Sequence, residues 1–246
     1  MSESDGESET VPSRVLVVVE LPIEGEFAPA LAETLAQSRP FILAIRSVPE
    51  QTAPEQAREE FEGESRAAME EVVEVFERDG TSVDSELVFT GDVDQTVDRY
   101  RDEFAADAVL YARPTDDIDR VLAVGTADID FDRFIRCLTS LGRTPLSTLK
   151  LLQLGDDEQA VDEQDLLLEG IESRLADRGV ADEIVVTESI VPARETAEVL
   201  EIAEGYDMMV VAARRPTIGD RIMGSLADSV LDQTDLPVLL VRAPAE

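Results

Sequence analysis

Short apolar runs alternate along this chain with longer segments in which apolar residues recur every three or four positions. That alternation is typical of β–α–β units. Because the runs are apolar throughout, the strands are expected to be buried on both faces, in a parallel sheet covered by helices. In the first half the predicted strands are Val15–Val19, Phe41–Val48, Val83–Phe89 and Ala108–Ala112, and the predicted helices are Glu26–Ser38, Glu55–Asp79 and Val93–Phe104.

The same pattern then restarts. Arg120–Gly125 repeats Arg14–Val19 at an offset of 106 residues, and Asp207–Ala212 repeats Asp107–Ala112 at an offset of 100. The fold class predicted is therefore α/β, with two tandem doubly wound parallel-sheet domains of the flavodoxin or Rossmann-like type. The other elements predicted in the second half are the strands Leu149–Leu154, Glu183–Thr187 and Val238–Val241, and the helices Leu166–Ala176, Pro192–Ala203 and Ser225–Thr234.

The two copies differ in how they end. We expect an acidic, disordered tail over 1–13, a first domain over 14–114 and a second over 120–246. Only Pro114–Asp119 lies between the copies, too short for a helix and a strand, so the first domain is predicted to lack its last helix and strand. That truncation would leave the edge of Ala108–Ala112 bare. We expect Val238–Val241 to lie beside it, which makes the chain an intrachain pseudo-dimer. A homodimer through Val238–Val241 is the alternative.

Charge narrows the possible partners and the environment. The 246 residues include 55 acidic and 21 basic ones, a formal net charge of −34, and Lys150 is the only lysine. Such charge strains a fold by self-repulsion, which molar salt screens. The sequence therefore predicts a cytoplasmic protein of a halophile that accumulates salt. Nucleic acid and membrane partners are not expected, because the chain lacks a basic excess and an apolar run long enough to span a bilayer. The acidic start is not that of a signal peptide.

Residue types limit the chemistry as well. The sequence has no histidine and a single cysteine, Cys137, which excludes Ser-His-Asp and Cys-His catalysis and thiolate–imidazole zinc sites. Cys137 is expected to be a buried core residue, with a reactive thiol as the alternative. No enzyme activity, catalytic residue or metal site is predicted. Three acidic pairs, which could be mistaken for cation sites, are expected to lie in solvated loops. These pairs are Asp116-Asp117, Asp128/Asp130 and Asp156-Asp157.

The end of the second half carries the most specific motif. An Asp-led apolar strand is followed by an Arg- and Gly-containing loop, then Gly224-Ser225 opening a helix, then the strand Pro237–Val241. In this motif the chain resembles the universal stress protein family, over 120–242 and less fully over 14–114. In ATP-binding members of that family, loop glycines and helix N–H groups hold the phosphates, and an Asp after the first strand lies near adenine and ribose.

The motif departs from that pattern where nucleotide would bind. Ala212 replaces the first glycine, and the turn is one residue short. Gly125 stands at the position of the Asp in the second copy. The first copy has Glu20 there but no phosphate loop. We therefore predict no cofactor, with ATP as the alternative.

The remaining candidate site is a phosphate or anion loop. Its residues are Arg214, Arg215, Gly219, Gly224 and Ser225. The alternative interpretation is that the arginines pair with surface carboxylates and that Ser225 only caps a helix. The resemblance implies a non-catalytic stress-response or regulatory protein with degenerate nucleotide sites. The alternative is a switch that binds ATP or another phosphate anion through this loop.

Overall fold

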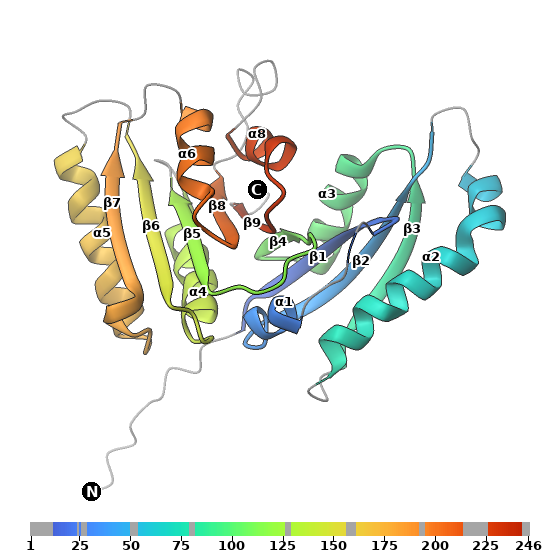
Figure 1. The fold of residues 1–246 in the computed structure, drawn as a ribbon, viewed down its shortest axis with the longest axis horizontal. Coiled ribbons are helices and arrows are strands. Elements are labelled where there is room, and N and C mark those ends of the chain that lie inside the picture. The colour runs from blue at the N-terminus through green and yellow to red at the C-terminus, as the bar shows by residue number, and fades with distance from the viewer. Residues whose placement is uncertain are drawn as a thin grey trace, which may run out of the picture.

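The computed structural model describes residues 12–23, 25, 29–49, 54–78, 82–125, 129–155, 161–191, 195–213 and 226–242. Within these residues the strands form one nine-stranded sheet in the order β3-β2-β1-β4-β9-β8-β5-β6-β7. Helices cover both faces of this sheet (Figure 1). The fold is therefore the predicted α/β doubly wound type.

The first half of the chain supplies the β3-β2-β1-β4 part of the sheet, in which every pairing is parallel. Long apolar strands with both faces covered explain this arrangement, because β1 is buried at six of its eight positions. The elements of this half are β1 Arg14–Leu21, α1 Pro29–Thr34, β2 Arg39–Ser47, α2 Pro54–Glu77, β3 Asp84–Thr90, α3 Val93–Phe104 and β4 Ala108–Tyr111.

The second half repeats this order as β7-β6-β5-β8 and adds β9 beside β8, again with parallel pairing. The first half ends after its fourth strand, as predicted. The elements of the second half are β5 Arg120–Gly125, α4 Phe131–Gly142, β6 Thr148–Leu154, α5 Val161–Ala176, η1 Asp182–Ile184, β7 Val185–Ile190, α6 Glu195–Ala203, β8 Met208–Ala213, α8 Leu226–Gln233 and β9 Val238–Arg242.

The two halves meet at β9. On one side β9 pairs in parallel with β8, and on the other it pairs antiparallel with β4. In the antiparallel register Ala108 faces Val241 and Tyr111 faces Val238. The edge of β4 that truncation would leave bare is thus covered by the last strand of the same chain.

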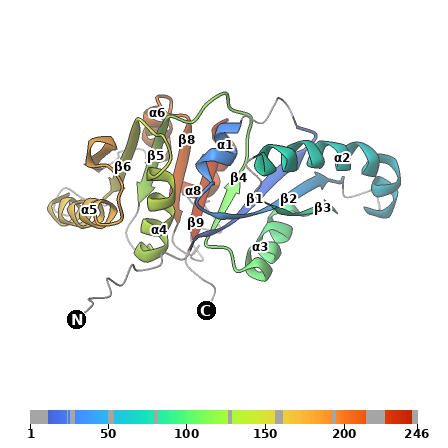
Figure 2. The ribbon, with the colours of Figure 1, turned by 90° about the horizontal axis from the view of Figure 1, so that it is seen from below.

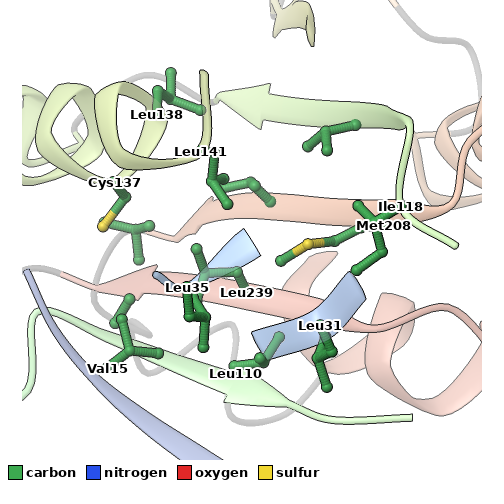
Figure 3. Packing of buried hydrophobic residues seen from close by; sticks show 14 of the residues in the cluster. Val15, Leu31, Leu35, Leu110, Ile118, Cys137, Leu138, Leu141, Met208 and Leu239 are labelled. Atoms are coloured by element: carbon green, nitrogen blue, oxygen red, sulfur yellow. The ribbon is translucent and has the colours of Figure 1, made fainter. Parts of the chain in front are cut away.

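One continuous apolar core lies under α1, α2, α4 and α5 and crosses the joint between the halves. Its central members include Leu31 and Leu35 from the α1 region, Leu110 from β4, Met208 from β8 and Leu239 from β9 (Figure 3). Figures 1 and 2 both place α1 between the two halves, next to α2. The opposite face carries two separate cores, one under α3 and one under α6 and α8. The continuous core makes the two halves one packed body.

Polar contacts hold both ends of the antiparallel joint. At the end of β4, the guanidinium of Arg113 donates hydrogen bonds to the backbone carbonyls of Leu231, Thr234 and Leu236, where α8 ends. Such a cation satisfies carbonyls that a helix end leaves unpaired. At the start of β4, the carboxylate of Asp107 faces arginines of α4, as described below. Each contact links the first half to the second.

Several predicted boundaries are wrong, and the largest differences lie in three elements. The strand expected over Glu183–Thr187 is preceded by the 3-10 turn η1, so β7 begins at Val185 and runs to Ile190. The helix expected over Glu26–Ser38 ends at Thr34, because Leu35 and Ala36 donate to carbonyls three residues back and tighten the chain into turns. The helix expected from Leu166 already begins at Val161.

Candidate functional site

In doubly wound sheets, ligands bind outside the carboxyl ends of the strands, where the strand order changes direction. Here these points lie between β1 and β4 in the first half and between β5 and β8 in the second. Because β4 and β9 are antiparallel, the strands of the two halves run in opposite directions. The two points therefore open at opposite ends of the strands of the sheet.

In the first half, the loops after β1 and β4 touch. Gly25 has φ 125°, and a Cβ at this position would lie 2.9 Å from the Cβ of Pro114, which follows β4. Only glycine fits there, in both conformation and space. Further along the same linker Ile118 is buried in the main core. Glu20, the counterpart of the family's post-strand Asp, is exposed on β1. Linker residues therefore occupy the first switch point.

In the second half, the last described residue at the carboxyl end of β5 is a glycine and not an acidic residue. Gly125 ends β5, with Gln153 of β6 on one side and Ala212 of β8 on the other. A Cβ at Gly125 would lie 2.7 Å from the Oε1 of Gln153, a side chain that is only 3% exposed. The Gln153 amide thus takes the space into which a side chain from position 125 would point. The resemblance drew attention to Gly125, but nothing in the sequence singled out Gln153.

The predicted anion loop falls outside the described residues: Arg214, Arg215, Gly219, Gly224 and Ser225 all do. Its flanks are described. β8 ends at Ala213, beside the carboxyl end of β5, and α8 begins at Leu226. The loop therefore connects the carboxyl end of a central strand to the N-terminus of a helix.

Two members of the acidic pairs have local structural roles, and Asp116 is exposed. Asp130 caps α4, its carboxylate accepting the N–H of Arg133 at 3.1 Å. The side chain of Asp117 accepts the N–H of Ile118 at 2.8 Å. Asp128, Asp156 and Asp157 lie outside the described residues. Among the residues that the structure does describe, no group of three or more His, Cys, Asp or Glu side chains is placed to hold a metal ion.

Cys137 is confirmed as a core residue. It lies on α4, is 2% exposed and belongs to the continuous core beneath α4. Burial, with the nearby carboxylate of Asp107 as a smaller cause, raises the pKa of the thiol from 9.0 to about 12. At neutral pH it is therefore a protonated thiol and not a nucleophile.

Each half contains one aspartate that binds the backbone at the start of its first strand. The sequence pattern had marked these residues only as the starts of later strands. Asp207 precedes β8 and accepts the N–H groups of Asp119 and Arg120 at 3.0 and 2.8 Å. Asp107 precedes β4 and accepts the N–H of Arg14 at 3.0 Å. In each case the carboxylate satisfies backbone donors where the first strand of the half begins. The repeat itself contained this signal, because both residues occupy matching positions.

The strand order and crossovers define a doubly wound α/β protein made of two similar halves. Residues 140–242 match the sequence model of the universal stress protein family. The match to Universal stress protein G of Shigella flexneri and of Escherichia coli O157:H7 is 47% identical over 47 residues, 18% of this chain and 33% of theirs. The aligned region thus spans only a third of these relatives' length.

Two solved structures share the fold over both halves. One is a universal stress protein from Archaeoglobus fulgidus, with a TM-score of 0.59 at 12% identity, covering 92% of this chain and 98% of the other. The second is a putative universal stress protein from Pseudomonas aeruginosa, with a TM-score of 0.53 at 16% identity, covering 95% and 94%. At these identities the likeness establishes the fold. Within the described residues, no helix has the length and apolar character needed to cross a membrane.

Proposed function

We propose that this chain is a non-catalytic regulatory or stress-response protein, a tandem universal stress protein in which both nucleotide sites are degenerate. The observation that carries the proposal is the state of the two switch points. The first is occupied by the contact of Gly25 with Pro114, and the second has Gly125 and the Gln153 amide where the family's ATP-binding members have an acidic side chain.

The available residue types support a binding role over catalysis. The sequence has no histidine, and its one thiol is buried and protonated at neutral pH. General acid–base and thiolate chemistry would then need other groups. The carboxylates of Asp107, Asp130 and Asp207 accept backbone hydrogen bonds and serve the fold.

The arrangement of β9 supports a monomeric protein. Both edges of β9 are paired within the chain, with β8 and with β4, so that strand offers no free edge to a second copy. An intrachain pseudo-dimer replaces the homodimer that β9 could otherwise form. The net charge of −34 supports a protein that works in a salt-rich cytoplasm, without nucleic acid as a partner.

Titration calorimetry with MgATP in molar KCl tests the proposal. We expect weak or undetectable heat of binding. Position 212 is alanine, and it lacks the freedom of a glycine to let the backbone come close to a phosphate. A micromolar Kd would contradict degenerate sites. Binding that is weakened by Arg214→Ala and by Ser225→Ala, but not by the control Arg66→Ala on exposed α2, would instead establish the phosphate-binding switch. Mass spectrometry of small molecules released from the protein purified in molar KCl would name any ligand carried along.

A further inference from the structure

A hollow of about 430 Å³ lies on the α2 side of the first half, beside its occupied switch point. Its apolar floor includes Leu21 at the end of β1 and Val72 and Val75 of α2. Volumes in this range are typical of small-molecule sites. The hollow follows α2 from Glu64 to Arg78, about 20 Å at 1.5 Å per residue. It can therefore hold an elongated molecule.

A buried hydroxyl without a partner lines this hollow. Ser65 lies in the buried stripe of α2, at helical spacing from Met69, Val72 and Phe76, and is 1% exposed. Its Oγ makes no hydrogen bond to any residue that the structure describes. A hydroxyl left unpaired in such a place costs about 1–3 kcal/mol, and serine in a helix commonly avoids this cost by donating to the carbonyl four residues back. The orphan hydroxyl indicates that a ligand group completes the site.

An arginine lies at the same end of the hollow. On β2, Ile42 and Ala44 point into the main core, and strand alternation puts Arg46 on that same face. The Arg46 guanidinium carbon lies 4.7 Å from the ring centroid of Phe61, one helical turn before Ser65. Among the described residues no carboxylate is within ion-pair distance of Arg46. Its planar fork of N–H groups is suited to a carboxylate.

The other charged side chains of the lining are mainly acidic. Glu64, Glu71 and Glu74 are exposed side chains along the hollow, and Arg78 lies at its far end. Among the described lining residues, these groups and Arg46 leave one negative charge in excess. A ligand of net charge +1 with a carboxylate at one end would match both the order and the sum of these charges.

We propose that this hollow binds a basic amino acid. Its carboxylate faces the Arg46 guanidinium and the Ser65 hydroxyl, its aliphatic stem covers Leu21, Val72 and Val75, and its terminal cation faces Glu71 and Glu74. No step of this arrangement depends on the predicted anion loop of the second half. The proposal thus stands or falls separately from the state of the nucleotide sites.

The test is calorimetric titration of the full-length protein with L-lysine and L-arginine, at the lowest KCl concentration that keeps it folded, because salt screens these contacts. We expect saturable binding of at least one of them. L-norleucine, which lacks the terminal ammonium, and cadaverine, which lacks the carboxylate, should each bind at least tenfold more weakly. No saturable binding of either amino acid would overturn the proposal. Equal binding of cadaverine would do so too, since it would reduce the site to an acidic surface that attracts cations.

Variants locate the site. Arg46→Gln and Ser65→Ala should each weaken binding at least tenfold, whereas Arg66→Gln, on the same helix and paired with Glu62 at the surface, should not. Ser65→Ala should at the same time keep or raise the melting temperature of the unliganded protein, since it removes an unpaired buried hydroxyl. A purely structural serine would leave binding unchanged. Undiminished binding in both Arg46→Gln and Ser65→Ala would overturn the assignment. So would a loss of binding in Arg214→Ala with both of these variants unaffected.

Discussion

Asp107 of the first half accepts a hydrogen bond from the Arg136 guanidinium of the second half at 3.1 Å. Arg133 lies near the same carboxylate oxygen, at 3.5 Å, and the Asp107 side chain is 17% exposed. This cluster sits at one end of the antiparallel joint between β4 and β9, and Arg113 sits at the other. The joint is short, only four residue pairs, so these polar contacts are expected to matter for its stability.

The Asp107 cluster can be isolated by a matched pair of variants. Asp107→Asn removes a charge that accepts one backbone N–H group and faces arginines of the other half, whereas Asp207→Asn removes a charge that accepts two backbone N–H groups. We expect Asp107→Asn to lower the free energy of unfolding by about 2 kcal/mol and Asp207→Asn by about 1 kcal/mol. Urea unfolding at constant salt measures both. Because Asp107 accepts one backbone N–H group and Asp207 two, a loss for Asp107→Asn of about half that for Asp207→Asn or less would mean that the arginines contribute nothing measurable.

The opposite end of the joint depends on Arg113. Arg113→Gln leaves carbonyls at the end of α8 without a cationic donor. We expect a loss of about 2 kcal/mol in the free energy of unfolding. Hydrogen exchange should show faster opening of β4, β9 and α8 than of β2 or β6. The exposed control Arg66→Gln should change stability by less than about 0.5 kcal/mol.

Salt should stabilise the whole molecule. With a net charge of −34, self-repulsion grows as the Debye length rises from about 3 Å in molar KCl to about 10 Å at 0.1 M. We expect the melting temperature to fall over that range. A melting temperature independent of KCl would refute the halophilic interpretation.

Cys137 makes alkaline stability testable. The unfolded thiol ionises near pH 9.0, whereas the folded one does so only near pH 12, so above pH 9.0 the unfolded state loses a proton that the folded state keeps. Stability contributed by this group is complete below pH 9.0 and falls as the pH rises toward 12, by up to about 1.4 kcal/mol per pH unit. Cys137→Ala should flatten that part of the profile relative to the native protein. Identical slopes would show that the thiol is not protected.

The oligomeric state follows from β9. Light scattering in molar KCl should give a mass near the 26.9 kDa of one chain. Leu239→Pro removes a backbone donor from the middle of β9 and should destabilise the chain by about 3 kcal/mol or more. A stable dimer that Leu239→Pro dissociates into folded monomers would favour the homodimer instead.

Sequence reasoning reached most of the fold because the strands are apolar on both faces and repeat in order. It located Arg120–Gly125 and Val93–Phe104 at the boundaries that the structure has, and it expected Val238–Val241 to lie near Ala108–Ala112. It did not anticipate that the antiparallel pairing would make one nine-stranded sheet. Register between distant segments depends on packing that a local pattern does not contain.

The candidate site was less accessible to the same reasoning. A motif drew attention to residues 214–225, and the departures at Ala212 and Gly125 could be read directly. The hydroxyl of Ser65 and the guanidinium of Arg46 could not, because a serine in a helical stripe and an arginine at a strand end are common in any sequence. Their importance appears only when folding brings both to one hollow.

The central position of β9 has a consequence for how the protein is made. Synthesis on the ribosome proceeds from the N-terminus, and domains generally fold as they emerge. Here β4 gains its second neighbour only after β5 to β9 have been translated, because β9 follows them in the sequence. The first half therefore carries an open edge until β9 has been made, and a chain that stops before β9 would expose edges of β4 and β8 together. Pairing with β9 is thus the step that completes both halves.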